Sequence, residues 1–208
     1  MKKTKTTNVA VLASGNGTNF EVLTKAINRK RFTTAKIKLL ISDVEKSFVR
    51  KRAKRLRVKD IFLNPKKFSS RREYDEFLVK ILKEEKIGLV VLAGYMRIVS
   101  PYFIKSFKNR ILNVHPALLP AFKGKNSIKR ALSYGCKITG VTVHFVDEMV
   151  DNGPIVLQQS LRINEGESFK ELESAVHSLE YKLLPQAVKL FVEKRLKVNN
   201  RNRCVKII

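Results

Sequence analysis

A short apolar run that ends in a glycine-containing turn constrains the fold of this chain more than any other feature. Residues Asn8–Ala13 read NVAVLA and residues Ser14–Asn19 read SGNGTN. Apolar residues then recur at helical spacing from Phe20 to Ile27. A strand that is apolar along its whole length is typical of a parallel sheet covered on both faces. The pattern therefore predicts a strand, a glycine turn and a helix.

The alternation of strand and helix continues through the first half of the chain. Further apolar strands are expected at Ile37–Ile41, Asp60–Leu63 and Leu89–Ala93, and helices at about Ser47–Leu56 and Arg71–Glu85. The second of these helices is amphipathic, with five apolar residues expected on one face: Tyr74, Phe77, Leu78, Ile81 and Leu82. Alternating strands and helices favour a doubly wound, mostly parallel α/β sheet with helices on both faces.

The pattern changes after Arg110. The following segments are expected: a strand to His115, a short helix ending at Leu132, strands at Gly140–Val146 and Ile155–Ile163, a long helix at Ser168–Glu193 and an exposed strand pair in Arg195–Ile208. Because no linker, repeat or low-complexity stretch interrupts the chain, we expect one domain over residues 1–208. It would have two halves, 1–100 and 101–193, and a tail at 194–208.

The charge of the chain is strongly basic, with 43 Lys and Arg residues against 18 acidic ones and a net charge of +25. Nucleic acid, a membrane surface or an anionic substrate would each suit this charge. The basic residues are spread along the chain and cluster only at Arg50–Arg57 and Arg201–Arg203. This distribution favours a general enrichment in basic residues over one dedicated partner, so we expect no nucleic-acid partner.

The cysteine and hydropathy patterns indicate a cytoplasmic protein. The two cysteines, Cys136 and Cys204, form no disulfide framework and are expected to be free thiols. Apolar runs stay well below the ~20 residues that span a bilayer. The apolar run after Met1 is also too short for a signal peptide, so we expect neither export nor a membrane partner.

The glycine turn is the first candidate site. Glycines allow a ligand to approach the backbone closely, and the start of a helix offers N–H groups and a partial positive charge. This combination binds phosphate, although the turn matches neither the P-loop nor the dinucleotide fingerprint. The sequence leaves open the alternative of a structural turn with Thr18 as the helix N-cap.

The second candidate site combines Asn113, His115 and an acidic loop. Residues two apart on a strand face the same way, so the Asn113 amide and the His115 ring are expected side by side, where both can donate to an oxyanion. An aspartate from Asp147–Pro154 could raise the pKa of His115. A structural polar pair and a solvated turn remain the alternatives. The histidines and cysteines lack metal-ligand spacing, so no metal is expected.

Four motifs in a fixed order together resemble the phosphoribosylglycinamide formyltransferase family. They are SGNGTN at Ser14–Asn19, LAGYMRIVSPYF at Leu92–Phe103, NVHPALLPAF at Asn113–Phe122 and GVTVHFVDEMVDNGPIVLQ at Gly140–Gln158. The resemblance covers nearly the whole chain. It implies a Rossmann-like formyltransferase fold with a phosphate-binding first half and a folate-binding, catalytic second half.

The resemblance also implies a reaction and its residues. The formyl group of 10-formyltetrahydrofolate would pass to the amine of glycinamide ribonucleotide in purine biosynthesis, with Asp151 keeping His115 charged and no metal involved. The implied catalytic residues are Asn113, His115 and Asp151. The implied ribonucleotide-binding residues are Gly17, Thr18, Asn19, Phe20, Glu21 and Glu180. The implied folate-binding residues are Arg71, Met96, Arg97, Ile98, Val99, Asn113, Val146 and Asp147.

Three other functions share features of this chain. Formyltetrahydrofolate hydrolase has a similar catalytic half but carries an N-terminal regulatory domain, for which the strand at Asn8 leaves no room. Methionyl-tRNA formyltransferase adds a C-terminal domain, whereas only a short tail follows Glu193. A nonspecific RNA-binding module would not need the complete set of Asn113, His115 and Asp151. A monomer and a homodimer both fit the sequence.

Overall fold

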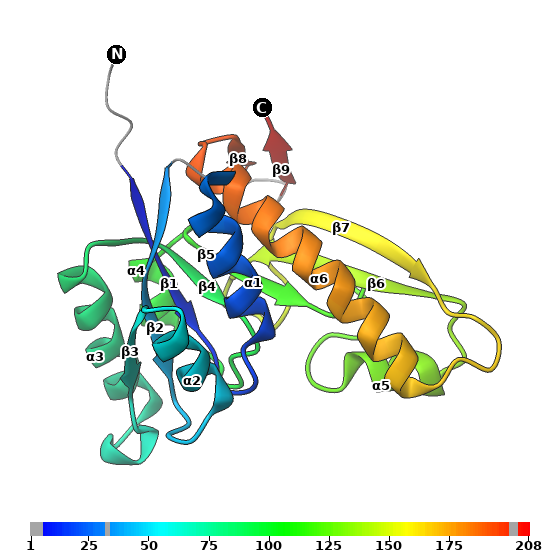
Figure 1. The fold of residues 1–208 in the computed structure, drawn as a ribbon, viewed down its shortest axis with the longest axis horizontal. Coiled ribbons are helices and arrows are strands. Elements are labelled where there is room, and N and C mark those ends of the chain that lie inside the picture. Colours follow the sequence, from blue (N-terminus) through cyan, green and yellow to red (C-terminus); the bar gives the residue numbers. More distant parts are fainter. Residues whose placement is uncertain (1–5, 32–33, 200–203) are drawn as a thin grey trace. The chain divides into compact units, whose positions relative to one another are not determined.

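A computed structural model describes residues 6–31, 34–199 and 204–208. The chain divides into two compact units, one ending at Leu112 and the other beginning at Asn113. Figure 1 shows the course of the chain and the labels of its elements. The basic cluster at Arg201–Arg203 lies outside the described residues.

The first unit is built around a parallel sheet. Its elements are β1 (Thr7–Leu12), α1 (Thr18–Ala26), the π-helical segment η1 (Ile27–Arg31), β2 (Ala35–Ser42), α2 (Phe48–Arg55), β3 (Lys59–Phe62), the 3-10 turn η2 (Pro65–Lys67), α3 (Arg71–Glu84), β4 (Ile87–Leu92) and α4 (Pro101–Ser106). The strand order in this unit is β3-β2-β1-β4, and all three pairings are parallel. The chain thus starts in the middle, winds outward to β3 and crosses back to β4, as in a doubly wound sheet.

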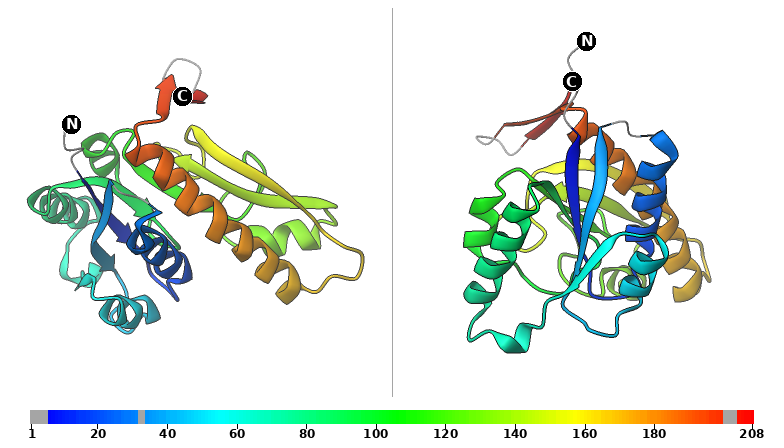
Figure 2. Two further views of the ribbon diagram at one scale, coloured as in Figure 1. Left: turned by 45° about the horizontal axis from the view of Figure 1, so that its top comes forward. Right: turned by 60° about the vertical axis from the view of Figure 1, so that its left-hand side comes forward.

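Helices cover both faces of this sheet. Figures 1 and 2 show α1 and α2 on one side of β1 and β2, with α3 and α4 on the other. Residues Val9–Leu12 of β1 are completely buried, as a strand between two helical layers requires. The predicted α/β class, with mostly parallel strands and helices on both faces, is confirmed in this unit.

The buried face of α3 differs from the predicted one. Tyr74, Leu78 and Leu82 are buried as expected, but Phe77 is 44% exposed. Asp75 is buried in its place, because its carboxylate accepts the backbone N–H of Ser100. The buried face of α3 therefore includes Asp75 and excludes Phe77, unlike the face that hydrophobicity alone predicts. The short helix α4 was not predicted.

The second unit combines an antiparallel hairpin with a long helix. Its elements are β5 (Ile111–His115), in which the division between the units falls, α5 (Ser127–Ser133), β6 (Ile138–Phe145), β7 (Ile155–Arg162), α6 (Phe169–Val192), β8 (Leu196–Asn199) and β9 (Cys204–Ile207). β6 pairs antiparallel with β7, and α6 packs against both strands and against α5. The predicted strand pair in the tail is confirmed as β8 and β9, which pair antiparallel.

Candidate active site

Asn113, His115 and Asp151 come together in the second unit. Asn113 and His115 lie two residues apart on β5, and Asp151 lies in the loop between β6 and β7 with a left-handed φ of 45°. The Asn113 Nδ2 donates to Asp151 Oδ1 at 3.2 Å, and His115 Nδ1 lies 3.3 Å from Asp151 Oδ2. The loop therefore carries one carboxylate to the two side chains that strand alternation placed on one face.

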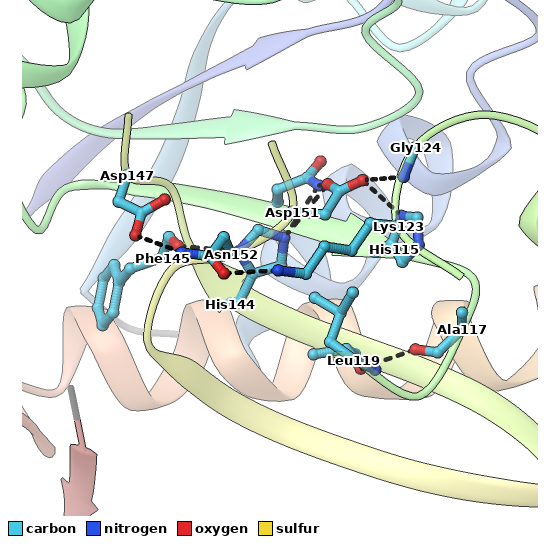
Figure 3. Close-up of polar contacts among 12 residues, drawn as sticks. His115, Ala117, Leu119, Lys123, Gly124, His144, Phe145, Asp147, Asp151 and Asn152 are labelled. Atoms are coloured by element: carbon cyan, nitrogen blue, oxygen red, sulfur yellow. Dashed lines mark hydrogen bonds and ion pairs between the residues drawn. The ribbon is translucent and has the colours of Figure 1, made fainter. Parts of the chain in front are cut away.

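A second histidine, His144, approaches the same group from β6. Its Nε2 lies 3.2 Å from Asn113 Nδ2 and 3.7 Å from Asp151 Oδ1, and its Nδ1 lies 2.8 Å from the carbonyl oxygen of Phe145. Figure 3 shows Asp151 beside both histidines. Because a carbonyl only accepts, Nδ1 carries a proton, and in the neutral ring Nε2 accepts from the Asn113 amide.

Sequence reasoning weighed His144 only as a metal ligand and missed this contact. A signal for it was present in the alternating segment Gly140–Val146. Thr142 and His144 are two apart on β6 and share a face, and Thr142 Oγ1 donates to the carbonyl of Ala117 at 2.7 Å, just after β5. A residue two positions along should therefore face the end of β5 as well.

Both ring nitrogens of His115 face an acceptor oxygen. Its Nε2 lies 3.0 Å from the carbonyl oxygen of Phe122, and the residue is only 4% exposed. Burial lowers the pKa of His115 below its ordinary value, although the Asp151 carboxylate and the Phe122 carbonyl act in the opposite direction. Asp151 thus raises the pKa of His115, as expected, but burial has the larger effect. The charged ring loses more hydration on burial than these two acceptors replace.

Asp151 is ionised despite its partial burial. Burial by itself would raise the pKa of its carboxyl group, but the neighbouring His144 ring, the charge on His115 and the Gly124 N–H together lower it. The Gly124 N–H donates to Asp151 Oδ2 at 2.8 Å. Nearby, Lys123 Nζ donates to Asn152 Oδ1 at 2.5 Å, so the Phe122–Asn126 segment contacts the acidic loop at two points.

The predicted phosphate turn lies in the first unit. Gly17, with φ 76°, occupies the N-cap position of α1, and the first helical bond runs from the Glu21 N–H to the Gly17 carbonyl at 3.0 Å. The interpretation of Thr18 as the N-cap is therefore wrong. Because glycine has no side chain, it gives no side-chain cap to the N–H groups that start α1. This arrangement leaves the turn suited to an anion.

The side chains of the predicted phosphate-binding residues differ in access. Gly17, Thr18 and Asn19 are half-buried. The Phe20 side chain is completely buried, so only its backbone is available to a ligand. Glu21 is buried and forms ion pairs with Lys25, Arg52 and Arg55.

The predicted folate-binding segment after β4 presents an apolar surface. Met96 is 62% exposed and Ile98 is 58% exposed, whereas Val99 is buried. The Arg97 guanidinium stacks on the Tyr74 ring at 4.7 Å from its centroid. The remaining predicted residue of this unit, Arg71, is exposed at the first position of α3.

This segment is tied to the glycine turn by one hydroxyl group. The backbone N–H of Met96 donates to Ser14 Oγ at 2.9 Å, and Ser14 Oγ donates to Asp43 Oδ1 at 2.6 Å. Two predicted binding segments of the first unit therefore share a buried serine that sequence reasoning did not single out.

The other predicted binding residues lie in the second unit. Val146 and Asp147 begin the loop that carries Asp151, and Asp147 Oδ1 accepts the Met149 N–H at 3.1 Å. Glu180 is buried on α6, with its Oε2 2.9 Å from His177 Nδ1. The charge of Glu180 acts to raise the pKa of His115, though less than Asp151 does.

The described residues give two negative findings. Over residues 6–31, 34–199 and 204–208, no cluster of three or more His, Cys, Asp or Glu side chains could hold a metal ion. In the same part of the chain, no helix combines the length and hydropathy that a membrane crossing needs.

Comparisons with known proteins agree on one family. Residues 7–188 match the family described as formyl transferase. The chain is 34% identical to phosphoribosylglycinamide formyltransferase of Bacillus subtilis over 92% of this chain and 96% of that protein. It is 38% identical to the Haemophilus influenzae protein of the same name over 92% of this chain and 90% of the other.

Solved structures agree with these sequence matches. Glycinamide ribonucleotide transformylase 1 from Symbiobacterium toebii superposes with a TM-score of 0.94 at 37% identity. The superposition covers 98% of this chain and 94% of that chain, which confirms the predicted fold class.

Proposed function

The chain belongs to the phosphoribosylglycinamide formyltransferase family, and on this basis we propose that it formylates glycinamide ribonucleotide. The formyl donor is 10-formyltetrahydrofolate, and the products are formylglycinamide ribonucleotide and tetrahydrofolate, in purine biosynthesis. Besides the family, the observation that carries this proposal is the contact of the Asp151 carboxylate with both Asn113 and His115.

Asn113 supplies a donor for the oxyanion. The substrate amine attacks the formyl carbon, and the carbonyl oxygen becomes negatively charged in the tetrahedral intermediate. The Asn113 amide is oriented by Asp151 and His144, and an oxyanion is a stronger acceptor than the neutral ring it would replace. One such oriented donor is worth about 3 kcal/mol in the transition state.

His115 and Asp151 handle charge and protons. A nearby oxyanion favours the protonated ring of His115, so this ring gains its charge as the intermediate forms, against the effect of burial. In the resting structure His115 Nε2 contacts the Phe122 carbonyl. To donate a hydrogen bond to the oxyanion, Nε2 gives up this contact. The ionised Asp151 accepts the proton that the attacking amine loses, directly or through water, and passes it to His115 Nδ1, which gives the ring its charge. The same proton then returns through Asp151 to the folate nitrogen as this nitrogen leaves, so that the enzyme ends in its starting protonation state.

Binding is assigned to residues of both units. We assign the ribonucleotide phosphate to the backbone of Gly17–Glu21, whose helix start has a glycine N-cap and a partial positive charge. The glycinamide end is assigned to Glu180. The folate is assigned to Arg71, Met96–Val99 and Val146–Asp147, where exposed Met96 and Ile98 offer apolar contact to a planar ring.

An absorbance assay of folate release tests the function. The purified protein is incubated with 10-formyltetrahydrofolate, with and without glycinamide ribonucleotide, and in a third arm with methionyl-tRNA. Tetrahydrofolate release that requires the ribonucleotide supports the proposal. Release without any acceptor would indicate a hydrolase, release that requires methionyl-tRNA would indicate that transferase, and no release would overturn the proposal.

We further propose that the partners are small molecules and that the protein is cytoplasmic. The anionic phosphate and folate carboxylates suit the net charge of +25 without a nucleic acid. Analytical ultracentrifugation with and without added RNA tests whether the protein binds RNA. The same experiment distinguishes a monomer from a homodimer. A complex with RNA that persists at physiological salt would contradict the proposal.

A further inference from the structure

Helix α2 contacts three consecutive residues of the glycine turn. The Val49 N–H donates to the Gly15 carbonyl at 3.1 Å. Arg52 donates twice to Asn16, from Nε to the carbonyl at 2.8 Å and from Nη2 to Oδ1 at 2.9 Å. At Gly17, an added Cβ would lie 2.2 Å from Cγ2 of Val49. The turn is therefore shaped by α2 and not by its own sequence alone.

Arg52 also reaches the helix that follows the turn. Its Nη1 donates to Glu21 Oε2, in the first turn of α1. The Arg52 side chain is only 16% exposed, so this contact is largely shielded from water. The planar guanidinium has donors on several edges, which allows one side chain to hold a backbone carbonyl, an amide and a carboxylate together. Arg52 thus connects the residue before Gly17 to the first turn of α1.

Glu21 makes this connection electrostatically important. Hydrogen bonds and charge from Lys25 and Arg52 lower the pKa of Glu21 against the effect of burial, so the carboxylate is ionised. An unopposed carboxylate in the first turn of a helix would repel a phosphate bound at that helix start. Arg52 opposes this charge from inside the fold, and Arg55 opposes it from the surface, with Nη2 at 2.8 Å from Glu21 Oε2.

We propose that Arg52 is a positioning residue for the phosphate of the ribonucleotide. Through Asn16, Arg52 holds the glycine turn in the shape that exposes the N–H groups of the turn. Through Glu21, Arg52 offsets the negative charge of the carboxylate beside these N–H groups. The inference rests on the proposed function of Gly17–Glu21 as the phosphate site. It adds a residue of α2 that the predicted phosphate-binding set does not contain.

The test compares two Arg52 variants with a matched control on the same helix. Arg52→Met removes both the charge and the hydrogen-bond donors. Arg52→Lys keeps the charge but loses the planar guanidinium that donates to several groups at once. The control is Arg50→Met. Arg50 is also ion-paired, with Nε 2.8 Å from Asp60 Oδ2 and Nη1 2.7 Å from the Glu45 carbonyl, neither of which belongs to the turn. Steady-state kinetics are measured on the full chain for both substrates.

The expected result is a selective loss of ribonucleotide affinity. Arg52→Met raises the KM for the ribonucleotide by about tenfold, since a charge-assisted hydrogen bond contributes about that factor. The KM for the folate and kcat change little, as expected when only binding of one substrate is weakened. Arg52→Lys gives an intermediate KM, and Arg50→Met behaves as the wild type.

Three outcomes would overturn the inference. They are an unchanged ribonucleotide KM in Arg52→Met, an equal rise in Arg50→Met, and a loss confined to kcat. If Arg52→Met does not fold, Arg52→Lys carries the test, and a wild-type KM in that variant would count against the role.

A second readout separates this inference from the proposed function. Binding of inorganic phosphate is followed by phosphorus NMR line broadening, which requires no catalysis. A wild-type protein without ribonucleotide-dependent transfer would overturn the function by itself. The role of Arg52 would then still be supported if Arg52→Met weakens phosphate binding relative to Arg50→Met, and overturned if the two variants bind alike.

Discussion

At the scale of single residues, His115 and His144 approach the same carboxylate but differ in their second contact. His144 Nδ1 is bonded to the carbonyl of Phe145, within β6 itself, whereas His115 Nε2 is bonded to the carbonyl of Phe122, in a loop. A partner in a strand is fixed by the sheet, while a loop carbonyl can move without breaking a strand ladder. His144 is therefore suited to orient Asn113, and His115 is suited to exchange partners during the reaction.

Replacing Asn113 by alanine should lower kcat by about a hundredfold or more, because one oxyanion donor is lost. The KM for each substrate should change less. Kinetics on the purified variant measure this. Asn8→Ala is a matched control, since the Asn8 amide also donates within the fold, to the carbonyl of Glu85 at 3.2 Å. A similar loss of kcat in both variants would mean that Asn113 has only a structural role.

His115→Ala and Asp151→Asn should each cut turnover by roughly two to four orders of magnitude, the usual range for a positioned acid or base. Asp151→Asn keeps the size of the side chain and removes only its charge. Circular dichroism should show the fold unchanged in both variants. A variant that is folded and retains the wild-type rate would remove that residue from the mechanism.

At the scale of elements, the glycine turn and α2 fit together closely at one position. Gly17 combines a positive φ of 76° with a backbone that leaves no room for a Cβ beside Val49. At Gly15, two residues earlier, an added Cβ would have no atom within 4 Å, and φ is not in the left-handed region. Two glycines of the same turn therefore differ in how strongly the structure requires glycine.

Gly17→Ala should lower the free energy of unfolding by about 1–3 kcal/mol, from backbone strain and overpacking. Gly15→Ala should change it by no more than about 0.5 kcal/mol. Urea unfolding of both variants measures the difference. Equal free energies of unfolding in the two variants would show that α2 can shift to accommodate a larger residue at position 17.

On helix α6, the hydrogen bond to Glu180 raises the pKa of His177. A raised pKa in the folded state stabilises the fold fully below the unfolded value of about 6.5. This stabilisation is lost as the pH rises through the folded value. The destabilisation caused by His177→Gln should therefore be largest at acidic pH and shrink with rising pH. Urea unfolding across this range measures it, and a difference that grows with pH would contradict the assignment.

At the scale of the whole molecule, the net charge of +25 acts on every anionic ligand. Salt screens such attraction, with a Debye length of about 10 Å at 0.1 M. The value of kcat/KM for the ribonucleotide should therefore fall severalfold as salt is raised to ~0.2 M, while kcat at saturation changes little. Kinetics in a sodium chloride series measure this. A flat kcat/KM would mean that the charge has no part in substrate capture.

The local pattern of the sequence determined the elements and one face of the site. Apolar runs such as Val9–Leu12 predicted buried parallel strands, because a strand between two helical layers has no polar face. Strand alternation placed Asn113 and His115 on one face. These features depend on neighbours in the sequence, so the sequence alone contains them.

Only the tertiary structure decided which distant groups these residues meet. His144 lies 31 positions from Asn113, and Arg52 lies 36 positions from Asn16, so no local pattern joins them. The lowered pKa of His115 and the burial of Asp75 in place of Phe77 likewise depend on groups that are distant in the sequence. Loss of hydration depends on all atoms packed around a group, wherever they stand in the chain, and this is why the fold had to be known first.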